Sequence, residues 1–302
     1  MSLHVIVGAG PVGSATARLL ADDGHRVRVV TRTGSGPEHA AIERIAADAT
    51  DAARLAGIAA GAAALYNCAN PPYHRWPTDW PPLASALLTA SERSSAVLVT
   101  MSNLYGYGPV SQPMTEDMPL AATTVKGRIR ARMWHDALAA HEAGRIRATE
   151  ARASDFVGPG CRSVITDMLL APVRQGRRAL VPVNFDVPHS ATYTGDVART
   201  LIAIAGDERA WGRPWHVPTN PAITLRELAT QFAALAGAPE PRLRSMPNWM
   251  LRLGGLFSPV AREFVEMRYQ FERPFVLDSS AAERTLGVKP TPLDDALRSI
   301  LL

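Results

Sequence analysis

The stretch Leu3-His-Val-Ile-Val-Gly-Ala-Gly-Pro-Val-Gly13, with the residues 14–31 that follow it, decides the fold of this chain. Its pattern predicts an apolar strand over 3–7, a helix over 14–21 and a second apolar strand over 27–31. In such a βαβ unit three glycines permit a tight turn, the approach of a pyrophosphate and close helix–strand packing. The helix N-terminus adds unpaired N–H groups that bind phosphate. The predicted dinucleotide site comprises Gly8, Gly10, Pro11, Val12 and Gly13.

The end of the second strand selects the cofactor. An acidic residue there binds the ribose 2′-OH of NAD(H), whereas a cation accommodates the 2′-phosphate of NADP(H). This chain has Thr31 and Arg32 at that point, and its next carboxylate is Glu38. A guanidinium grips phosphate through two N–H groups, and the threonine hydroxyl adds a donor. The sequence therefore favours NADP(H), with a solvated loop arginine as the alternative.

The rest of the chain continues the alternation of strands and helices. Further strands are predicted over 42–47, 61–68, 96–100 and 146–150, and helices over 80–93 and 123–143. This order predicts an α/β fold, a Rossmann-type doubly wound parallel sheet. We expect residues 1–160 to form the NADP(H)-binding core. Residues 161–302 are expected to form mainly a small mixed α/β C-terminal region for substrate, with a return to the core near 186–206.

Two loops extend the predicted cofactor site. Asp48 and Ala49 follow the third strand, where a carboxylate can accept from the adenine amino group, and Asp51 is placed to cap the next helix. Ala69 opens a loop with two prolines that is rigid and lies beside the switch point of the sheet. A set of apolar residues near the C-terminus forms either a cap over the cofactor crevice or ordinary core: Trp249, Met250, Leu251, Phe257, Phe264, Met267, Tyr269, Phe271 and Phe275.

Composition excludes several classes of protein. The 302 residues are 47% hydrophobic and carry a net charge of +4, with cations interleaved among carboxylates, so a nucleic-acid partner is not expected. Two cysteines are too few for a disulfide framework or a Cys-rich zinc site, and no metal is predicted. No stretch resembles a leader or a membrane span, which predicts a cytoplasmic location. Of the 32 basic residues only Lys126 and Lys289 are lysines, which suggests that Lys126 is kept for its compact ammonium group.

These features together resemble the extended short-chain dehydrogenase/reductases, the NAD(P)-dependent epimerase/dehydratase superfamily, over nearly the whole chain. The resemblance rests on six motifs besides the glycine loop: Asp48-Ala-Thr-Asp51, Leu104-Tyr-Gly106, Lys126, Arg152-Ala-Ser-Asp-Phe-Val-Gly-Pro-Gly160, Tyr193-Thr-Gly-Asp196 and Arg273-Pro-Phe-Val-Leu-Asp278. It implies that Lys126 holds the nicotinamide ribose. It also implies a homodimer formed through the helices 80–93 and 123–143, with a monomer as the alternative.

The departures from the family pattern concern the proton donor. Ala122 stands where the family's catalytic Tyr is expected, and Met101 where its Ser or Thr is expected. A proton must therefore come from another residue. The candidates are the phenols of Tyr105 and Tyr107, the Ser102 hydroxyl and the Asp155 carboxyl group, besides the hydroxyls of Thr123 and Thr124. A phenol beside the Lys126 ammonium is expected to have a lowered pKa, although Tyr105 also has a structural interpretation.

Two further departures narrow the substrate. Asp155 and His189 stand where sugar-nucleotide enzymes of the family place an Asn and an Arg that bind the diphosphate. A carboxylate repels a diphosphate, so a nucleotide sugar is disfavoured. The sequence thus predicts an NADP(H)-dependent oxidoreductase acting on a small, mostly apolar carbonyl compound. The alternatives are a redox-neutral epimerase or isomerase that uses its nicotinamide transiently, and a non-catalytic NADP(H)-sensing protein.

Overall fold

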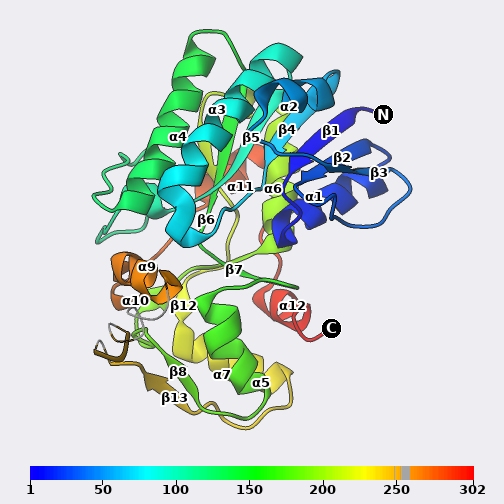
Figure 1. Cartoon of the computed structure of the whole chain (residues 1–302). Coiled ribbons are helices and arrows are strands. Elements are labelled where there is room, and N and C mark those ends of the chain that lie inside the picture. Colours follow the sequence, from blue (N-terminus) through cyan, green and yellow to red (C-terminus); the bar gives the residue numbers. More distant parts are fainter. Residues whose placement is uncertain (248, 252, 254–258) are drawn as a thin grey trace.

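A seven-stranded parallel sheet forms the centre of the protein (Figure 1). The computed structural model describes residues 1–247, 249–251, 253 and 259–302. The strands of the sheet are β1 (Leu3–Val7), β2 (Arg26–Thr31), β3 (Ile42–Ala46), β4 (Ala62–Asn67), β5 (Val97–Asn103), β6 (Ala148–Ala153) and β11 (Pro214–His216). Their order is β11-β6-β5-β4-β1-β2-β3, which confirms the predicted doubly wound sheet.

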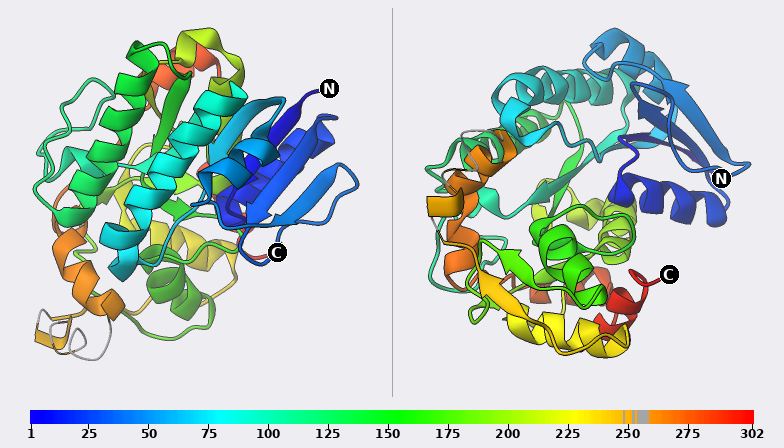
Figure 2. Two further views of the ribbon diagram at one scale, coloured as in Figure 1. Left: turned by 45° about the horizontal axis from the view of Figure 1, so that its top comes forward. Right: turned by 60° about the horizontal axis from the view of Figure 1, so that its bottom comes forward.

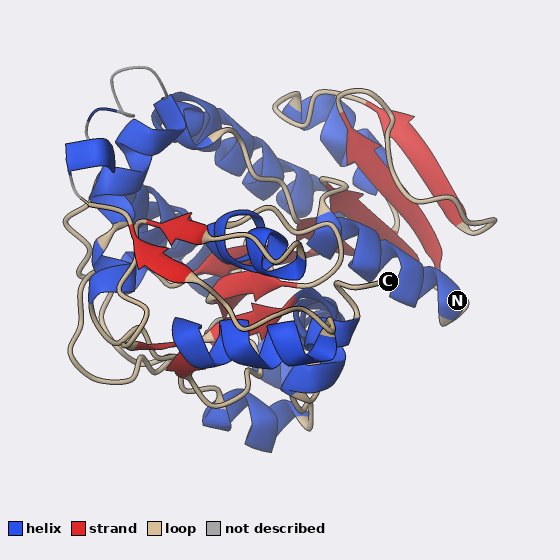
Figure 3. Cartoon of the chain, turned by 90° about the horizontal axis from the view of Figure 1, so that it is seen from below, coloured by secondary structure: helices blue, strands red, loops and turns tan. Residues whose placement is uncertain are grey.

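Helices cover both faces of this sheet, as the view from below also shows (Figure 3). They are α1 (Pro11–Asp22), α6 (Thr194–Gly206) and α11 (Ser280–Leu286) against one face, and α2 (Ala52–Ala59), α3 (Trp76–Ser94) and α4 (Val125–Glu142) against the other. All five residues of β1, including His4, are buried, because helices cover both faces of the parallel sheet. Its register with β2 pairs Leu3 with Arg26 and Val7 with Val30.

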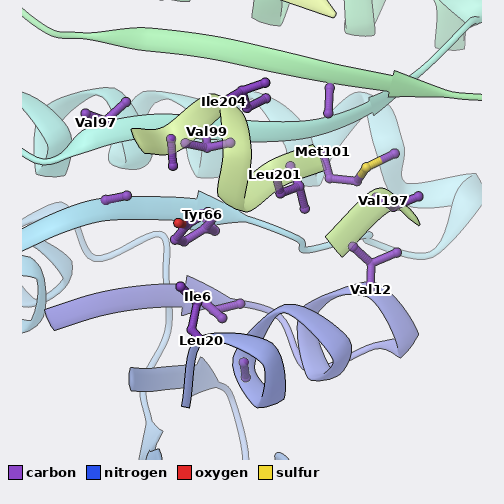
Figure 4. Close-up of a cluster of buried hydrophobic side chains, with 14 of the residues drawn as sticks. Ile6, Val12, Leu20, Tyr66, Val97, Val99, Met101, Val197, Leu201 and Ile204 are labelled. Atoms are coloured by element: carbon purple, nitrogen blue, oxygen red, sulfur yellow. The ribbon is translucent and has the colours of Figure 1, made fainter. Parts of the chain in front are cut away.

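One core cluster lies between the sheet and the helices α1 and α6 (Figure 4). Side chains of β1, β4 and β5 contribute Ile6, Tyr66 and Val99 to it, and α6 contributes Leu201. Met101 belongs to the same cluster, because alternate residues of β5 point to the same face. The Met101 thioether is thus part of a core side chain that is 8% exposed.

Several predicted boundaries differ from the observed ones, among them those of α3 and β6. Helix α3 begins at Trp76 rather than at residue 80, and Pro77 stands in its first turn, where the missing N–H has no intrahelical partner to lose. Strand β6 spans Ala148–Ala153 rather than 146–150. Ile146 precedes it because its N–H bonds to the carbonyl of Ala140 at 3.4 Å and so continues the end of α4.

The C-terminal region gathers most of its elements at one end of the molecule (Figure 2). Its strand pairs are β7 with β10, β8 with β13 and β9 with β12. The strands are β7 (Asp155–Val157), β8 (Ala179–Val181), β9 (Pro188–His189), β10 (Ala191–Tyr193), β12 (Ile223–Thr224) and β13 (Leu243–Ser245). The helices are α5 (Ala171–Arg174), α7 (Leu225–Leu235), α9 (Pro259–Met267), α10 (Tyr269–Glu272) and α12 (Leu293–Arg298), besides the π-helix η3 (Val164–Leu170) and the short turn η4 (Glu208–Ala210). Two further short turns, η1 (Tyr73–Arg75) and η2 (Tyr105–Tyr107), follow β4 and β5.

Several of the apolar residues near the C-terminus pack as core. Phe264 and Phe271 join the C-terminal cluster around Phe232, and Phe275 packs with Tyr107. Trp249 is 62% exposed, and Phe257 lies outside the described residues. No helix among the described residues has the length and apolar character needed to cross a bilayer.

Candidate functional site

The glycine loop after β1 has the shape expected of a dinucleotide cradle. Gly8 has φ +101°, and a Cβ there would lie 2.7 Å from the carbonyl oxygen of Cys68. A Cβ on Gly13 would lie 2.0 Å from the carbonyl oxygen of Gly8. Gly10, in contrast, has no atom within 4 Å of an added Cβ, which leaves open space beside the start of α1. The first and third glycines thus serve backbone packing, and the second leaves room for a pyrophosphate.

The loop after β4 meets the glycine loop at the switch point of the sheet. The amide of Ala69 lies 2.8 Å from the Cβ position of Gly8, and the amide of Cys68 donates to the Val7 carbonyl at 2.9 Å. Strand β1 lies between β4 and β2 in the sheet. The connections that follow β1 and β4 therefore run to opposite sides of β1. Ala69, Pro11 and Val12 therefore lie at the edge of the sheet where a dinucleotide binds in this fold.

The ends of β2 and β3 form the other predicted part of the cofactor site. Thr31 donates its hydroxyl to the Ser35 carbonyl at 3.0 Å, and Arg32 after it is exposed. Hydrogen bonds from Thr50 lower the pKa of Asp48, and the positive charge of Arg32 lowers it further. Ala49 is half-buried beside them. Arg32 and Asp48 are thus electrostatic neighbours at one edge of the cradle.

Asp51 confirms the capping prediction. Its side chain accepts from the Arg54 amide at 3.0 Å and so closes the first turn of α2. A capping carboxylate satisfies an N–H group that has no partner within the helix.

Lys126 stands in the first turn of α4, where its side chain is 1% exposed. Thr124 caps this helix by accepting from the Gly127 amide at 3.1 Å. The Lys126 ammonium forms ion pairs with Glu266 at 2.9 Å and with Glu263, both on α9. Glu266 also accepts a hydrogen bond from the Val125 amide, an N–H of the first turn of the helix. Glu263 and Glu266 were not among the predicted site residues, although their i, i+3 spacing places them on one side of a helix.

Two phenols meet beside Lys126. The hydroxyl of Tyr105 is in hydrogen-bond contact with the hydroxyl of Tyr73, and the Lys126 Nζ lies 5.2 Å from the centre of the Tyr73 ring. Trp76 packs against both rings at centroid distances of 4.9 and 6.1 Å. Tyr73 was not among the predicted site residues. The signal for it was its position directly after the Pro71-Pro72 pair, which fixes the loop at the end of β4.

The expected lowering of a tyrosine pKa by Lys126 is wrong. Burial, together with the negative charge of Asp155, raises the pKa of Tyr105 to about 12. Burial also raises the pKa of Tyr73 well above its usual range. Desolvation disfavours the charged phenolate. Both phenols therefore remain protonated at neutral pH.

Tyr107 belongs to a buried network rather than to the group around Lys126. Its hydroxyl contacts the Nε2 of His216 and accepts from the guanidinium of Arg152, both at 2.7 Å. Arg152 also pairs with Glu150 at 2.7 Å, and these side chains are nearly inaccessible to solvent. Burial raises the pKa of Tyr107 to about 12. The prediction of a catalytic Tyr107 is corrected here, because its hydroxyl is committed to two structural partners.

The remaining acid–base candidates lie on β5, β7 and β9. Ser102 is buried at the end of β5, opposite Arg152 on β6. Asp155 begins β7 and contacts the Nε2 of His189 at 2.8 Å. The His189 ring stacks on Phe271 at 4.9 Å and on Phe275 at 5.4 Å. The two residues that replace the family's diphosphate ligands thus bind each other.

A cavity of about 480 Å³ opens in the C-terminal region, away from the glycine loop. Val183, Phe185 and Leu243 supply apolar lining, and Arg226 with Arg268 supplies positive charge. Arg226 pairs with Asp186 at 2.7 Å, and Arg268 pairs with Glu272 at 3.0 Å. None of the predicted site residues lines it.

Solved structures of other proteins share this architecture. The match with the UDP-glucose 4-epimerase of Thermotoga maritima covers 99% of this chain and 97% of that one, with 16% sequence identity and a TM-score of 0.81. The match with a dTDP-glucose 4,6-dehydratase of Bacillus anthracis in complex with NAD covers 99% of this chain and 96% of that one, with 14% identity and a TM-score of 0.80. The match with the enzyme WbmH of Bordetella bronchiseptica in complex with NAD⁺ covers 100% of this chain and 97% of that one, with 18% identity and a TM-score of 0.76. These identities show a shared fold.

No curated protein matches the sequence. The model of the NAD-dependent epimerase/dehydratase family, however, matches residues 4–214. This span contains the glycine loop, Lys126 and the strands β1 to β6, and it covers well over half of the chain. The chain therefore belongs to the NAD-dependent epimerase/dehydratase family.

Proposed function

We propose that the protein is an NADP(H)-dependent oxidoreductase that reduces a small, mostly apolar carbonyl compound. The observation that carries the cofactor part is the pairing of an open glycine cradle with Arg32 at the end of β2, where no carboxylate follows until Glu38. Family members with solved structures in complex with NAD⁺ share the fold. Arg32 is the residue of this chain that supports binding of a 2′-phosphate, and therefore NADP(H) over NAD(H).

The cofactor would be held by residues at three places. The amides of Val12 and Gly13 at the start of α1 would face the pyrophosphate, and Thr31 with Arg32 would bind the 2′-phosphate. Lys126 would bind the hydroxyls of the nicotinamide ribose. When bound, the nicotinamide supplies a hydride to the carbonyl carbon.

Tyr105 is the proton donor in this proposal. With a pKa raised to about 12, its hydroxyl is protonated at neutral pH and can pass its proton to the substrate oxygen as that oxygen gains negative charge. Tyr73 acts as a positioning residue, because its hydroxyl contacts that of Tyr105. Asp155, which interacts electrostatically with both phenols, is paired with His189 and has no direct role in the transfer.

The surroundings of the phenols support a small, largely apolar substrate. Trp76 and the rings of Tyr73 and Tyr105 form an aromatic wall beside Lys126. The pair of Asp155 and His189 replaces the two groups that would bind a sugar diphosphate, and a carboxylate repels that anion.

The first experiment is a parallel titration of the purified protein with NADPH and NADH, monitored by nicotinamide fluorescence, after a spectrum has shown whether any cofactor copurified. We expect tight binding that is selective for NADPH, followed by NADPH consumption with members of a panel of small ketones and aldehydes. Equal affinities would overturn the NADP(H) assignment. Retained cofactor without net NADPH consumption would instead identify a redox-neutral epimerase, and binding of neither nucleotide would overturn the proposal.

A further inference from the structure

Partners within the protein occupy most of the surroundings of the Lys126 ammonium. Its side chain is 1% exposed, and its Nζ forms ion pairs with Glu263 and Glu266 of α9. The ring of Tyr73 lies 5.2 Å away on a third side. An ammonium group has three N–H donors, so two carboxylates occupy most of its hydrogen-bonding capacity.

The two carboxylates that pair with Lys126 are partly exposed to solvent. Their side chains are 28% and 23% exposed, whereas Lys126 is covered. Helix α9 lies directly below the first turn of α4 in two views (Figures 1 and 2). Phe264 packs against the C-terminal cluster and Met267 is fully buried, so apolar contacts also hold α9. The ion pairs with Lys126 and the hydrogen bond from the Val125 amide to Glu266 hold this side of α9 against the first turn of α4, so their loss would release that side of the helix.

The net charge around Lys126 also opposes cofactor binding while both glutamates are paired with it. Lys126 with two glutamates has a formal charge of −1, which repels a dinucleotide bearing several phosphate charges. Displacement of one carboxylate makes the local charge neutral and frees one N–H donor for a ribose hydroxyl.

We infer that Glu263 and Glu266 form a latch that competes with the nicotinamide ribose for Lys126, so that cofactor binding at this end and release of α9 are coupled. The inference rests on the proposed function, because it assumes that a nicotinamide dinucleotide binds. Binding energy used to release the latch lowers the apparent affinity of the whole cofactor, and an opened α9 admits substrate only after the cofactor has bound.

The test compares two ligands in four proteins. NADPH reaches Lys126, whereas adenosine 2′,5′-bisphosphate fills only the adenosine end of the site. Dissociation constants are measured by calorimetry for the wild type, Glu263→Gln, Glu266→Gln and Glu272→Gln. The last is the matched control, because it removes a carboxylate of α10 that pairs with Arg268 rather than with Lys126.

We expect Glu263→Gln and Glu266→Gln to bind NADPH about five- to tenfold more tightly, with unchanged affinity for the bisphosphate and no change for either ligand in Glu272→Gln. Hydrogen exchange over residues 259–267 should rise in the wild type with NADPH and stay constant with the bisphosphate. Weaker NADPH binding would mean that the glutamates position Lys126 and would overturn the latch.

Equal tightening for both ligands, or for the control as well, would reduce the effect to long-range electrostatics and would also overturn it. If each of the four proteins binds NADPH and the bisphosphate with equal affinity, the latch fails while the cofactor proposal stands. If no ligand binds to any variant, the proposed function itself fails and the latch fails with it.

Discussion

The hydroxyls of Tyr73 and Tyr105 are in contact across 32 positions of sequence. Tyr73 begins η1 after β4, and Tyr105 begins η2 after β5, so two adjacent strands of the parallel sheet bring them together. The loops that follow parallel strands collect at one edge of the sheet. The pair thus places two phenols beside Lys126, in a chain for which the family resemblance predicts Ala122 at the position of the catalytic tyrosine.

Removal of the Tyr105 hydroxyl is expected to abolish most of the proposed activity. Tyr105→Phe should lower kcat about 10²–10⁴-fold, the range for a general acid, with unchanged NADPH affinity. Tyr73→Phe should have a smaller effect of about tenfold, because Tyr73 acts through Tyr105. Steady-state kinetics and nucleotide titration measure both.

Tyr107→Phe is the contrasting variant in the same loop. It removes the partner of the Arg152 Nη1 and of the His216 Nε2, so we expect the free energy of unfolding to fall by about 1–3 kcal/mol while the folded fraction keeps its kcat. Equal losses of kcat in Tyr105→Phe and Tyr107→Phe would remove Tyr105 from the mechanism.

Arg32 is expected to discriminate between the two nucleotides. Arg32→Ala should weaken NADPH binding about 10- to 100-fold, the value of lost hydrogen bonds to a charged group, and should change NADH binding little. The matched control is Arg44→Ala, an exposed arginine of β3 that pairs with Glu38 at 3.4 Å. A parallel loss for both nucleotides in Arg32→Ala would contradict the 2′-phosphate assignment.

The three glycine variants separate packing from binding. Gly13→Ala should destabilise the fold by about 2 kcal/mol or more, because its Cβ would lie 2.0 Å from the Gly8 carbonyl oxygen. Gly10→Ala has space for its Cβ, so it should fold normally and lose nucleotide affinity. Gly57→Ala, inside α2 with no neighbour within 4 Å, should be neutral or stabilising by up to about 1 kcal/mol. Thermal unfolding and titration distinguish them, and a normally stable Gly13→Ala would refute the packing argument.

Stability should fall in mild acid because two histidines are buried in the neutral form. Burial lowers the pKa of both His4 and His216 to about 4. An unfolded histidine has a pKa near 6.5, so between pH 6.5 and 4 the unfolded chain binds protons that the folded chain does not. Stability is therefore complete above pH 6.5 and declines as the pH falls.

Each of these histidines should contribute roughly 1–2 kcal/mol of that loss by pH 5. Urea unfolding at pH 7.5 and 5.0 measures the difference, and His4→Gln and His216→Gln should each make it smaller. An unchanged difference in both variants would show that other groups cause the acid sensitivity.

The sequence was sufficient for the sheet because the information is local. The apolar runs of β1 and β2, the glycines between them and the cap at Asp51 depend on neighbouring residues, and each lies where it was predicted. The division into domains and the dimer through α3 and α4 stay predictions. Size-exclusion chromatography with light scattering tests the dimer.

The candidate site was harder to predict because its contacts are long-range. Glu266 lies 140 positions from Lys126, and no pattern near either residue indicates the pairing. The error on the tyrosine pKa has the same origin. The sequence shows a lysine near two phenols but not the burial that outweighs its charge.

The scarcity of lysine gives this protein a built-in spectroscopic reporter. Its primary amines are the N-terminus, Lys126 and Lys289, and of these Met1 and Lys289 are exposed whereas Lys126 is covered. Reductive methylation with ¹³C-formaldehyde should therefore label Met1 and Lys289 readily, and a Lys289→Arg variant assigns their signals. A ¹³C-methyl signal from Lys126 should appear only when its two carboxylates have left the ammonium accessible.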